Sequence, residues 1–240
     1  MQGYVSKSLS GLNFIKVHKL SRYTDSIKPL MMFGMYRQHD LDVYLNHNSE
    51  LTLVWQGCDG RDLTDEWAEL LKSKPCKHIA ISHWISRCLK KKGIAHELKP
   101  ITATKPKINL KPRGDSIYIY SSDLSKASGR YHGDQYIERI KERTGLNVIR
   151  ATLKTYNKSD LLKIYEKCFI NLRLTKFDGC PNTNLEMGLM GRRSIFNGKI
   201  PHSIKWKNID DICDSIMKEY ETRHEDNSKI AKDIYDYISN

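Results

Sequence analysis

The sequence lacks the features that would place it among membrane, secreted or zinc-binding proteins. None of its apolar runs approaches the roughly 20 residues of a membrane-spanning helix, and its first residues lack the basic start and apolar core of a signal peptide. Its six cysteines include no CxxC pair, which favours reduced thiols over disulfides or a zinc site. No Ser-His-Asp signature and no metal-ligand spacing is present. We therefore expect a cytoplasmic protein without a bound metal.

Charge is the unusual property of the composition. Of the 240 residues, 40 are Lys or Arg and 28 are Asp or Glu, which gives a net charge of +12. Residues 1–113 carry 19 basic and 10 acidic side chains, a net charge of +9, whereas residues 114–240 carry 21 and 18, a net charge of +3. This asymmetry indicates that the first half faces a polyanion or an anionic membrane. The alternative is a lysine-rich surface that is simply solvated.

Strand and helix patterns alternate along the first half of the chain. Apolar runs predict strands over residues 3–6, 30–36, 51–55 and 78–82. Amphipathic segments predict helices over residues 12–22, 63–72 and 83–92. Because alternating strands and helices form parallel, doubly wound sheets, we expect an α/β fold.

The segment 99–113 divides the sequence into two lobes. It holds three prolines, four lysines, one arginine and no acidic residue, a composition typical of a linker. We therefore predict an N-terminal lobe over residues 1–98 and a C-terminal lobe over residues 114–240. In the second lobe we predict strands over 115–120, 146–150, 168–174 and 194–196, and helices over 135–143, 158–167, 185–190, 206–220 and 228–238. Both lobes are expected to be Rossmann-like, and the N-terminal lobe is unusually small.

The stretch 177–195, FDGCPNTNLEMGLMGRRSI, organises the second lobe. A buried strand precedes it, Asp178-Gly179 is a turn signal, and a helix follows with Thr183 or Asn184 as its N-cap. A strand, a tight loop and a helix N-terminus gather backbone N–H groups and a positive dipole end. The stretch therefore predicts a place where a phosphate can bind.

Two carboxylates, Asp178 and Glu186, lie eight positions apart around this loop. A carboxylate can accept two charge-assisted hydrogen bonds from a vicinal diol, which suits the recognition of sugars. The alternative is that Asp178 forms only a turn and Glu186 only favours the start of a helix.

Together with the segment Met187-Gly188-Leu189-Met190-Gly191, these acids resemble the motif of a known enzyme family. The family is that of the retaining, GT-B-fold glycosyltransferases that use nucleotide-sugar donors. The spacing matches, although the first acid is Asp where the family usually has Glu. In that family the first acid and the loop amides hold hydroxyls of the donor sugar, and the second acid binds the ribose of the nucleotide.

The resemblance implies a UDP- or GDP-type nucleotide sugar as substrate and no separate cofactor. A first-lobe loop would face the donor phosphates, and an Arg or Lys in the first loop of the second lobe would neutralise the diphosphate, with Arg130 preferred over Lys126. A fixed cation stabilises the leaving group without a metal. Arg173 lies within the apolar strand 168–174 and therefore needs a partner. We expect it to bind Asp178 or an oxygen of the donor, or alternatively to form a structural ion pair. The expected donor-site residues are Gly11, Lys126, Arg130, Arg173, Asp178, Gly179, Asn182, Thr183, Asn184 and Glu186. No catalytic base is identified.

The acceptor side is expected in the first lobe. By position we place Asp59, Arg61 and His83 there, although His83 is alternatively a capping or core histidine. A small, basic glycosyltransferase of this kind resembles bacteriophage enzymes that glycosylate hydroxymethylated cytosines, so double-stranded DNA is the expected acceptor, with its target base flipped out. One alternative is an enzyme of cell-surface polysaccharide or lipid-linked sugar synthesis that lies on an anionic membrane. Another is a non-catalytic basic DNA-binding module.

Overall fold

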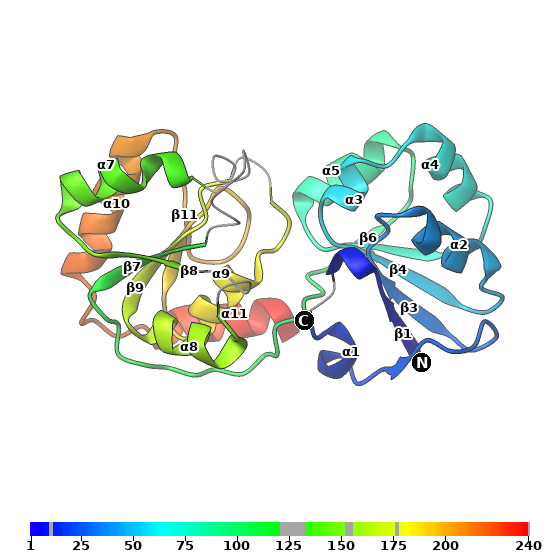
Figure 1. The fold of residues 1–240 in the computed structure, drawn as a ribbon, viewed down its shortest axis with the longest axis horizontal. Helices are drawn as coiled ribbons and strands as arrows, with labels where there is room; N and C mark the ends of the chain where they lie inside the picture. The colour runs from blue at the N-terminus through cyan, green and yellow to red at the C-terminus, as the bar shows by residue number, and fades with distance from the viewer. Residues whose placement is uncertain (10–11, 121–132, 152–155, 176–177, 240) are drawn as a thin grey trace. The chain divides into compact units, whose positions relative to one another are not determined.

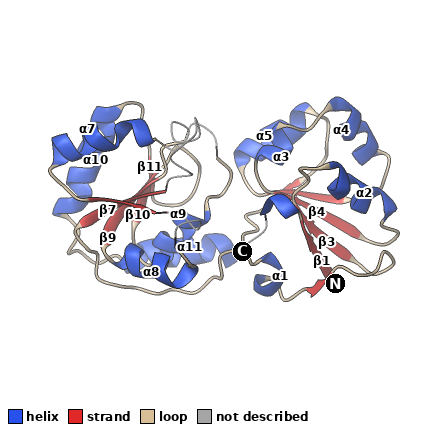
Figure 2. Cartoon of the chain, in the orientation of Figure 1, coloured by secondary structure: helices blue, strands red, loops and turns tan. Residues whose placement is uncertain are grey.

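The computed structural model describes residues 1–9, 12–120, 133–151, 156–175 and 178–239. Contacts within the chain group the protein into two compact units (Figure 1, Figure 2). Unit 1 consists of Met1–Lys105 with Asp178–Cys180, and unit 2 consists of Pro106–Phe177 with Pro181–Asn240. Each unit contains one parallel sheet, so the expected α/β class with two parallel sheets is confirmed. No helix within the described ranges is both long and apolar enough to cross a membrane.

Unit 1 is built on a six-stranded sheet with the order β2-β1-β3-β4-β5-β6, in which neighbouring strands are parallel. Its strands are β1 (Gln2–Val5), β2 (Ser21–Arg22), β3 (Leu30–Phe33), β4 (Leu51–Trp55), β5 (Lys77–Ala80) and β6 (Glu97–Leu98). Its helices are η1 (Lys7–Leu9), α1 (Phe14–Val17), α2 (Gln38–Asn46), α3 (Cys58–Arg61), α4 (Asp65–Lys72) and α5 (His83–Lys91). Thr64 and Ser82 cap α4 and α5, because their side chains accept backbone N–H groups of the first turn.

The first helix is much shorter than the predicted range of 12–22. α1 ends at Val17, and Lys19 adopts the left-handed conformation with φ 53°. The N–H of Leu20 then donates to the carbonyl of Ile15 at 3.0 Å, and the N–H of Lys19 donates to the carbonyl of Lys16 at 3.4 Å. These two bonds form a Schellman motif, which ends a helix. The following two residues therefore join the sheet as β2 instead of extending the helix.

Unit 2 is built on a five-stranded sheet with the order β11-β10-β9-β7-β8, again with parallel neighbours. Its strands are β7 (Ser116–Tyr120), β8 (Val148–Ala151), β9 (Cys168–Leu172), β10 (Arg193–Ile195) and β11 (Ser203–Ile204). Its helices are η2 (Asp134–Tyr136), α7 (Ile137–Thr144), α8 (Lys158–Glu166), α9 (Asn182–Leu189), α10 (Ile209–Glu221) and α11 (Ser228–Ser239). The short strand β11 is absent from the sequence prediction.

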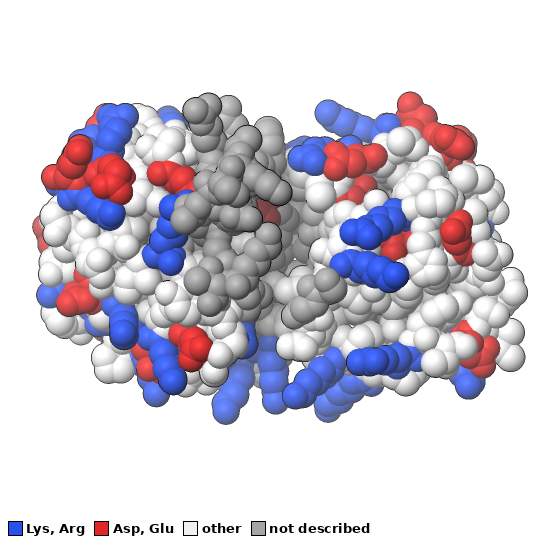
Figure 3. Space-filling model, in the orientation of Figure 1, with Lys and Arg blue, Asp and Glu red and all other residues white. Residues whose placement is uncertain are grey.

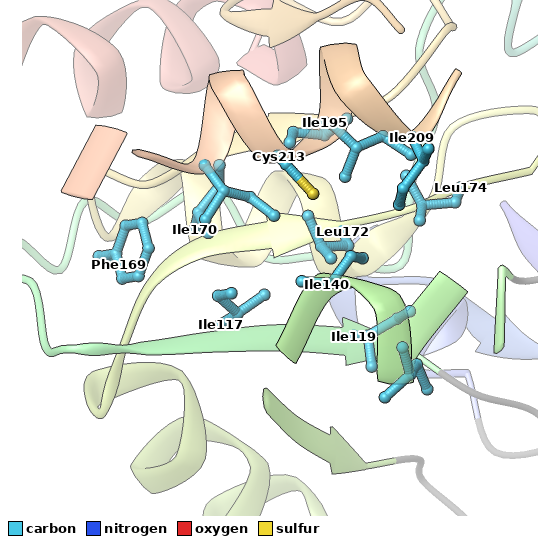
Figure 4. Packing of buried hydrophobic residues seen from close by; sticks show 13 residues of the cluster. Ile117, Ile119, Ile140, Phe169, Ile170, Leu172, Leu174, Ile195, Ile209 and Cys213 are labelled. Atoms are coloured by element: carbon cyan, nitrogen blue, oxygen red, sulfur yellow. The ribbon is translucent and has the colours of Figure 1, made fainter. Parts of the chain in front are cut away.

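Helices cover both faces of the unit 2 sheet. On one face α7 and α10 pack against β7, β9 and β10 through a cluster of buried aliphatic and aromatic side chains (Figure 4). On the other face, side chains of α8 and α9 pack in a second cluster, which includes Tyr118, Leu161, Tyr165 and Met187. Burial of one such side chain stabilises a protein by about 1.5–3 kcal/mol. The two clusters therefore fix β9 and α9, the elements on either side of the predicted phosphate-binding loop.

The basic segment that precedes β7 is attached to unit 2 by two arginines. Arg192 is 1% exposed, and its guanidinium donates to the carbonyl oxygens of Lys111 at 3.0 Å and Pro112 at 2.7 Å. Arg113 donates to the carbonyl oxygen of Arg223 at 2.9 Å, beyond the end of α10. Residues 111–113 of the predicted linker are therefore held on the surface of unit 2.

Candidate functional site

The start of α9 lies where the phosphate-binding feature is predicted, at the carboxyl end of β9. The helix begins at Asn182 with Pro181 in the N-cap position, two or three residues before the predicted N-cap. Proline suits this place because its φ of −65° fits the start of a helix and it has no N–H to satisfy. Pro181 offers no capping oxygen, and α9 has no side-chain cap within the described residues. The N–H of Asn184 donates to the carbonyl oxygen of Pro181 at 3.1 Å, and the first turn presents the positive end of the helix dipole without a side-chain cap.

A buried polar network connects this first turn to the sheet. Asn171 is fully buried in β9, and its Nδ2 donates to the Oδ1 of Asn184 at 2.7 Å and to the Oγ of Ser194 at 2.9 Å. Three other buried atoms near the turn have no hydrogen-bond partner in the described part of the chain: Asn171 Oδ1, Asn184 Nδ2 and Thr183 Oγ1. An unsatisfied buried polar atom costs about 1–3 kcal/mol. These atoms indicate that the site is completed by water or a ligand.

Glu186 projects from the second turn of α9 and is held from two directions. Its side chain is 12% exposed and forms an ion pair with Lys158 at the start of α8. The hydroxyl of Tyr165 donates to the other carboxylate oxygen at 3.3 Å. Burial, and then the charge of Glu186, raise the pKa of Tyr165 far above its usual range, so this phenol keeps the proton that it donates. Tyr118 supports the Tyr165 ring edge-on, with the ring centroids 4.9 Å apart.

Lys158 and Tyr165 are residues that the sequence analysis did not select. They stand seven positions apart on α8, which places them on the same face of the helix, two turns from each other. This spacing is visible in the sequence. Their contact with Glu186 depends on how α8 packs beside α9, and that packing is not visible there.

The first carboxylate of the motif, Asp178, organises its own turn. Its Oδ1 accepts the backbone N–H of Gly179 at 2.7 Å, and Asp178–Cys180 belong by their contacts to unit 1. Arg173 follows β9 and lies with its Cζ 4.4 Å from the centroid of the Tyr120 ring, a cation–π contact within unit 2. The common donor site of Asp178 and Glu186 remains a prediction.

Three expected donor-site residues, Gly11, Lys126 and Arg130, lie outside the described residues. Asn182 is the first residue of α9, partly exposed, as is Thr183 beside it. No group of three His, Cys, Asp or Glu side chains in the described ranges is placed to hold a metal ion.

In unit 1, Asp59 is buried instead of lining an acceptor cleft. It is 4% exposed, and its carboxylate accepts backbone N–H groups of Met35, Gln56, Gly57 and Gly60 at 2.7–3.3 Å. Burial raises its pKa to about 6, although these four donors act in the opposite direction. The carboxylate therefore shapes the segment after β4, where residues 58–61 form α3, a helix that is absent from the sequence prediction.

The other two expected acceptor-side residues are exposed. Arg61 forms a two-bond ion pair with the neighbouring Asp62, at 2.6 and 2.8 Å. His83 is the first residue of α5, directly after the capping residue Ser82. Lys7 and Arg37, which the sequence analysis overlooked, follow β1 and β3 at the carboxyl end of the same parallel sheet. In open α/β sheets ligands bind at that end.

Solved structures with a similar fold include glycosyltransferases and sugar-phosphate synthases. A TarM mutant of S. aureus in complex with fondaparinux, α-GlcNAc-glycerol and UDP has a TM-score of 0.62 and 13% identity, over 89% of this chain and 53% of TarM. A glycosyltransferase from Rickettsia africae has a TM-score of 0.54 and 11% identity, over 97% of this chain and 79% of that chain. A UDP-forming α,α-trehalose-phosphate synthase from Burkholderia vietnamiensis has a TM-score of 0.57 and 11% identity, over 98% of this chain and 80% of that chain.

These neighbours have the GT-B fold, so the expected two-lobe, Rossmann-like architecture is confirmed. The chain spans about half the length of TarM, 53% and 54% in its two structures. At 10–13% identity the likeness concerns the fold. No protein-family model and no curated protein sequence matches this chain.

Proposed function

We propose that this protein is a glycosyltransferase that moves a sugar from a UDP- or GDP-sugar to a hydroxyl acceptor, with retention of configuration. The observation that carries the proposal is the start of α9. The first turn of the helix, which no described side chain caps, and unsatisfied buried polar atoms lie there next to the anchored carboxylate of Glu186. Neighbours in fold are in complex with UDP and a GlcNAc-containing molecule, which supports a nucleotide-sugar donor.

The chemistry of these groups suggests their roles in donor binding. The first-turn N–H groups of α9 suit the donor diphosphate, because a helix N-terminus attracts phosphate. The carboxylate of Glu186 suits the two ribose hydroxyls, which are hydrogen-bond donors. We assign Asp178 and the amide of Gly179 to the sugar hydroxyls. We assign Arg130, or else Lys126, to the charge that develops on the leaving diphosphate.

For the acceptor we propose a hydroxymethylated base in DNA. The net charge of +9 on residues 1–113 supports a polyanionic acceptor, because Lys and Arg bind phosphates independently of sequence. The same charge is compatible with an enzyme that works on an anionic membrane and glycosylates a lipid-linked or polysaccharide acceptor. A transfer assay separates these possibilities.

The donor site is tested with Glu186→Gln, which keeps the volume of the side chain and removes its charge. Charge-assisted hydrogen bonds are about twice as strong as neutral ones, so we expect the Kd for UDP or GDP to rise about tenfold or more, which is ~1.4 kcal/mol. The matched control is Glu166→Gln on α8, whose carboxylate is 43% exposed and lies 3.7 Å from Lys111. Calorimetric titration measures both variants. Unchanged affinity in the Glu186 variant would show that the donor assignment is wrong.

Transfer is tested with radiolabelled UDP- and GDP-sugars. The acceptors are plain DNA, DNA containing hydroxymethylcytosine and a lipid extract, each at two salt concentrations. We expect label on the modified DNA, decreasing with salt. Label in the lipid fraction alone would indicate an enzyme of envelope synthesis. Absence of transfer from every donor would refute glycosyltransferase activity for these acceptors.

A further inference from the structure

The N-terminal segment of unit 1 is basic and contains no acidic side chain. Residues 1–24 include Lys7, Lys16, Lys19 and Arg22 but neither Asp nor Glu. Lys16, Lys19 and Arg22 are exposed on α1, the turn after it and β2. No ion pair joins these three side chains to a carboxylate within the described ranges. Their charges are therefore available to an external anion.

A second segment without acidic residues lies against the first. The Nε2–H of His18, at the end of α1, donates to the carbonyl oxygen of Thr102 at 3.0 Å. Thr102 belongs to the segment 99–113, and the exposed Lys105 follows three residues later. We call Lys16, Lys19, Arg22 and Lys105 the basic edge. In Figure 3 Lys and Arg side chains gather along the lower rim of unit 1, where α1 lies in Figure 1.

The backbone that carries these cations is firmly packed. Phe14 of α1 is 1% exposed and stacks on Phe33 of β3 with the ring centroids 4.5 Å apart. Gly3 of β1 lies so close to α1 that a Cβ atom there would be 2.4 Å from Ile15 Cδ1. The basic edge is thus presented from a fixed surface, and binding to it requires only side chains to be ordered.

Lys19 stands where a helix end usually has glycine. It is the left-handed residue of the Schellman motif, with φ 53°, a conformation that is unfavourable for residues with a Cβ atom. A lysine at this position makes the protein less stable than a glycine would, and it adds a positive charge to the basic edge. Backbone strain of this kind is commonly retained at functional sites.

The surroundings of the basic edge suit a nucleic acid better than a membrane. Peripheral membrane helices insert Trp, Phe or Leu side chains below the headgroups. The exposed large apolar side chains of unit 1 among the described residues are Met1, Ile27, Leu45 and Leu98, and all lie outside residues 13–24. Instead, the exposed neighbours of the cations include Asn13 and Ser21, whose side chains can donate to phosphate oxygens.

We propose that the basic edge binds the phosphate backbone of double-stranded DNA without reading its sequence. The inference rests on the proposed function for the identity of the polymer, and it adds where the polymer is held. Each phosphate contact contributes about −0.9 to the slope of log K against log salt, so four contacts give a slope of about −3.6. Binding then weakens roughly a hundredfold between 50 and 200 mM salt.

The test measures binding of a fluorescent 30-base-pair duplex by anisotropy at several salt concentrations. The edge variant carries K16Q, K19Q and R22Q. The matched control carries K28Q, K72Q and K77Q, which remove the same charge from lysines that are paired with Asp25, Glu69 and Glu97. We expect the slope of log K against log salt to be shallower by about 2.7 in the edge variant. The control should keep the wild-type slope.

A single substitution, Lys19→Gly, separates binding from structural integrity. It relieves the left-handed strain, so we expect the melting temperature to rise by about 2–4 °C while the salt slope falls by about 0.9. A variant that is more stable and binds DNA more weakly supports a role of Lys19 in binding. Unchanged DNA affinity in this variant would show that Lys19 does not contact the DNA.

Three results would overturn the inference. They are equal losses in the edge and control variants, absence of DNA binding at 50 mM salt, and tighter binding to phosphatidylglycerol vesicles than to DNA at equal phosphate concentration. The outcomes for transfer are separate. A protein that binds DNA through the basic edge but transfers no sugar refutes the proposed function and leaves this inference standing. Sugar transfer without DNA binding supports glycosyltransferase activity and refutes this inference.

Discussion

Removal of one hydroxyl group, in Tyr165→Phe, tests whether the carboxylate of Glu186 is positioned for a ligand. The Tyr165 hydroxyl donates to Glu186 at 3.3 Å from the buried side, while Lys158 pairs with the carboxylate from the solvent side. Without the phenol, we expect the carboxylate to turn toward Lys158, whose side chain is 49% exposed. A nucleotide must then reorder the Glu186 side chain when it binds.

The expected magnitude follows from the cost of that reordering. Immobilising one flexible side chain on binding costs about 0.5–1.5 kcal/mol, which corresponds to a Kd that is about two- to thirteenfold higher. The hydrogen bond itself exists before binding, so its full energy is not lost from the affinity. Because the ribose lies away from the reacting bond in the proposed arrangement, we expect KM for the donor to rise and kcat to stay close to its wild-type value.

The matched control is Tyr44→Phe. Tyr44 is as deeply buried, but it lies in unit 1, where its hydroxyl donates to the carbonyl oxygen of Leu71 at 2.9 Å. This variant should lose about 1 kcal/mol of stability, the usual net value of a hydrogen bond, and keep its donor affinity. Titration with UDP and GDP, together with thermal unfolding, measures both variants. Equal donor affinities in wild type and Tyr165→Phe, or equal losses in the two variants, would refute the positioning argument.

Two further predictions concern stability. Because burial raises the pKa of Asp59 from 3.8 to about 6, its contribution is fully present below pH 3.8 and decreases by about 3 kcal/mol as the pH rises through 6. Urea unfolding between pH 4 and 7 should show this loss, and Asp59→Asn should abolish it. Arg192→Met should leave the carbonyl groups of Lys111 and Pro112 without their donor, so limited proteolysis should cut residues 106–113 faster than in the wild type. Unchanged cleavage would show that other contacts hold this segment, among them those of Arg113 and the hydrogen bond from the N–H of Asn109 to the carbonyl oxygen of Leu189 at 3.0 Å.

Local sequence patterns were sufficient for some elements and misleading for others. β4 has the predicted bounds 51–55, because a short run of apolar residues ends directly at a glycine-containing loop. α1 was predicted too long because its stop signal is Lys19, a residue that seldom adopts a left-handed conformation. α3 was missed because glycine normally disfavours a helix, whereas here the buried Asp59 supplies the compensating contacts.

The candidate site was predictable only in part, since its contacts are tertiary. The spacing of Asp178 and Glu186 identified the loop and the helix start. In contrast, Asn171 appeared as one polar residue in an apolar strand, and its partners Asn184 and Ser194 stand 13 and 23 positions away. No periodicity connects residues at such distances. The packing of α9 against β9 and β10 brings them together.

The buried acids of unit 1 also show why formal charge understates its basic surface. Residues 1–105 contain 16 Lys and Arg and 10 Asp and Glu, but Asp40 and Asp59 are only 2% and 4% exposed. Asp40 accepts hydrogen bonds from the hydroxyls of Tyr4 and Ser6 and from two backbone amides after β3, as Asp59 does from the loop after β4. Both carboxylates are buried and hold the loops at the carboxyl end of the sheet by hydrogen bonds. The surface that meets solvent is therefore more basic than the sequence count, which strengthens the argument for an anionic partner of this unit.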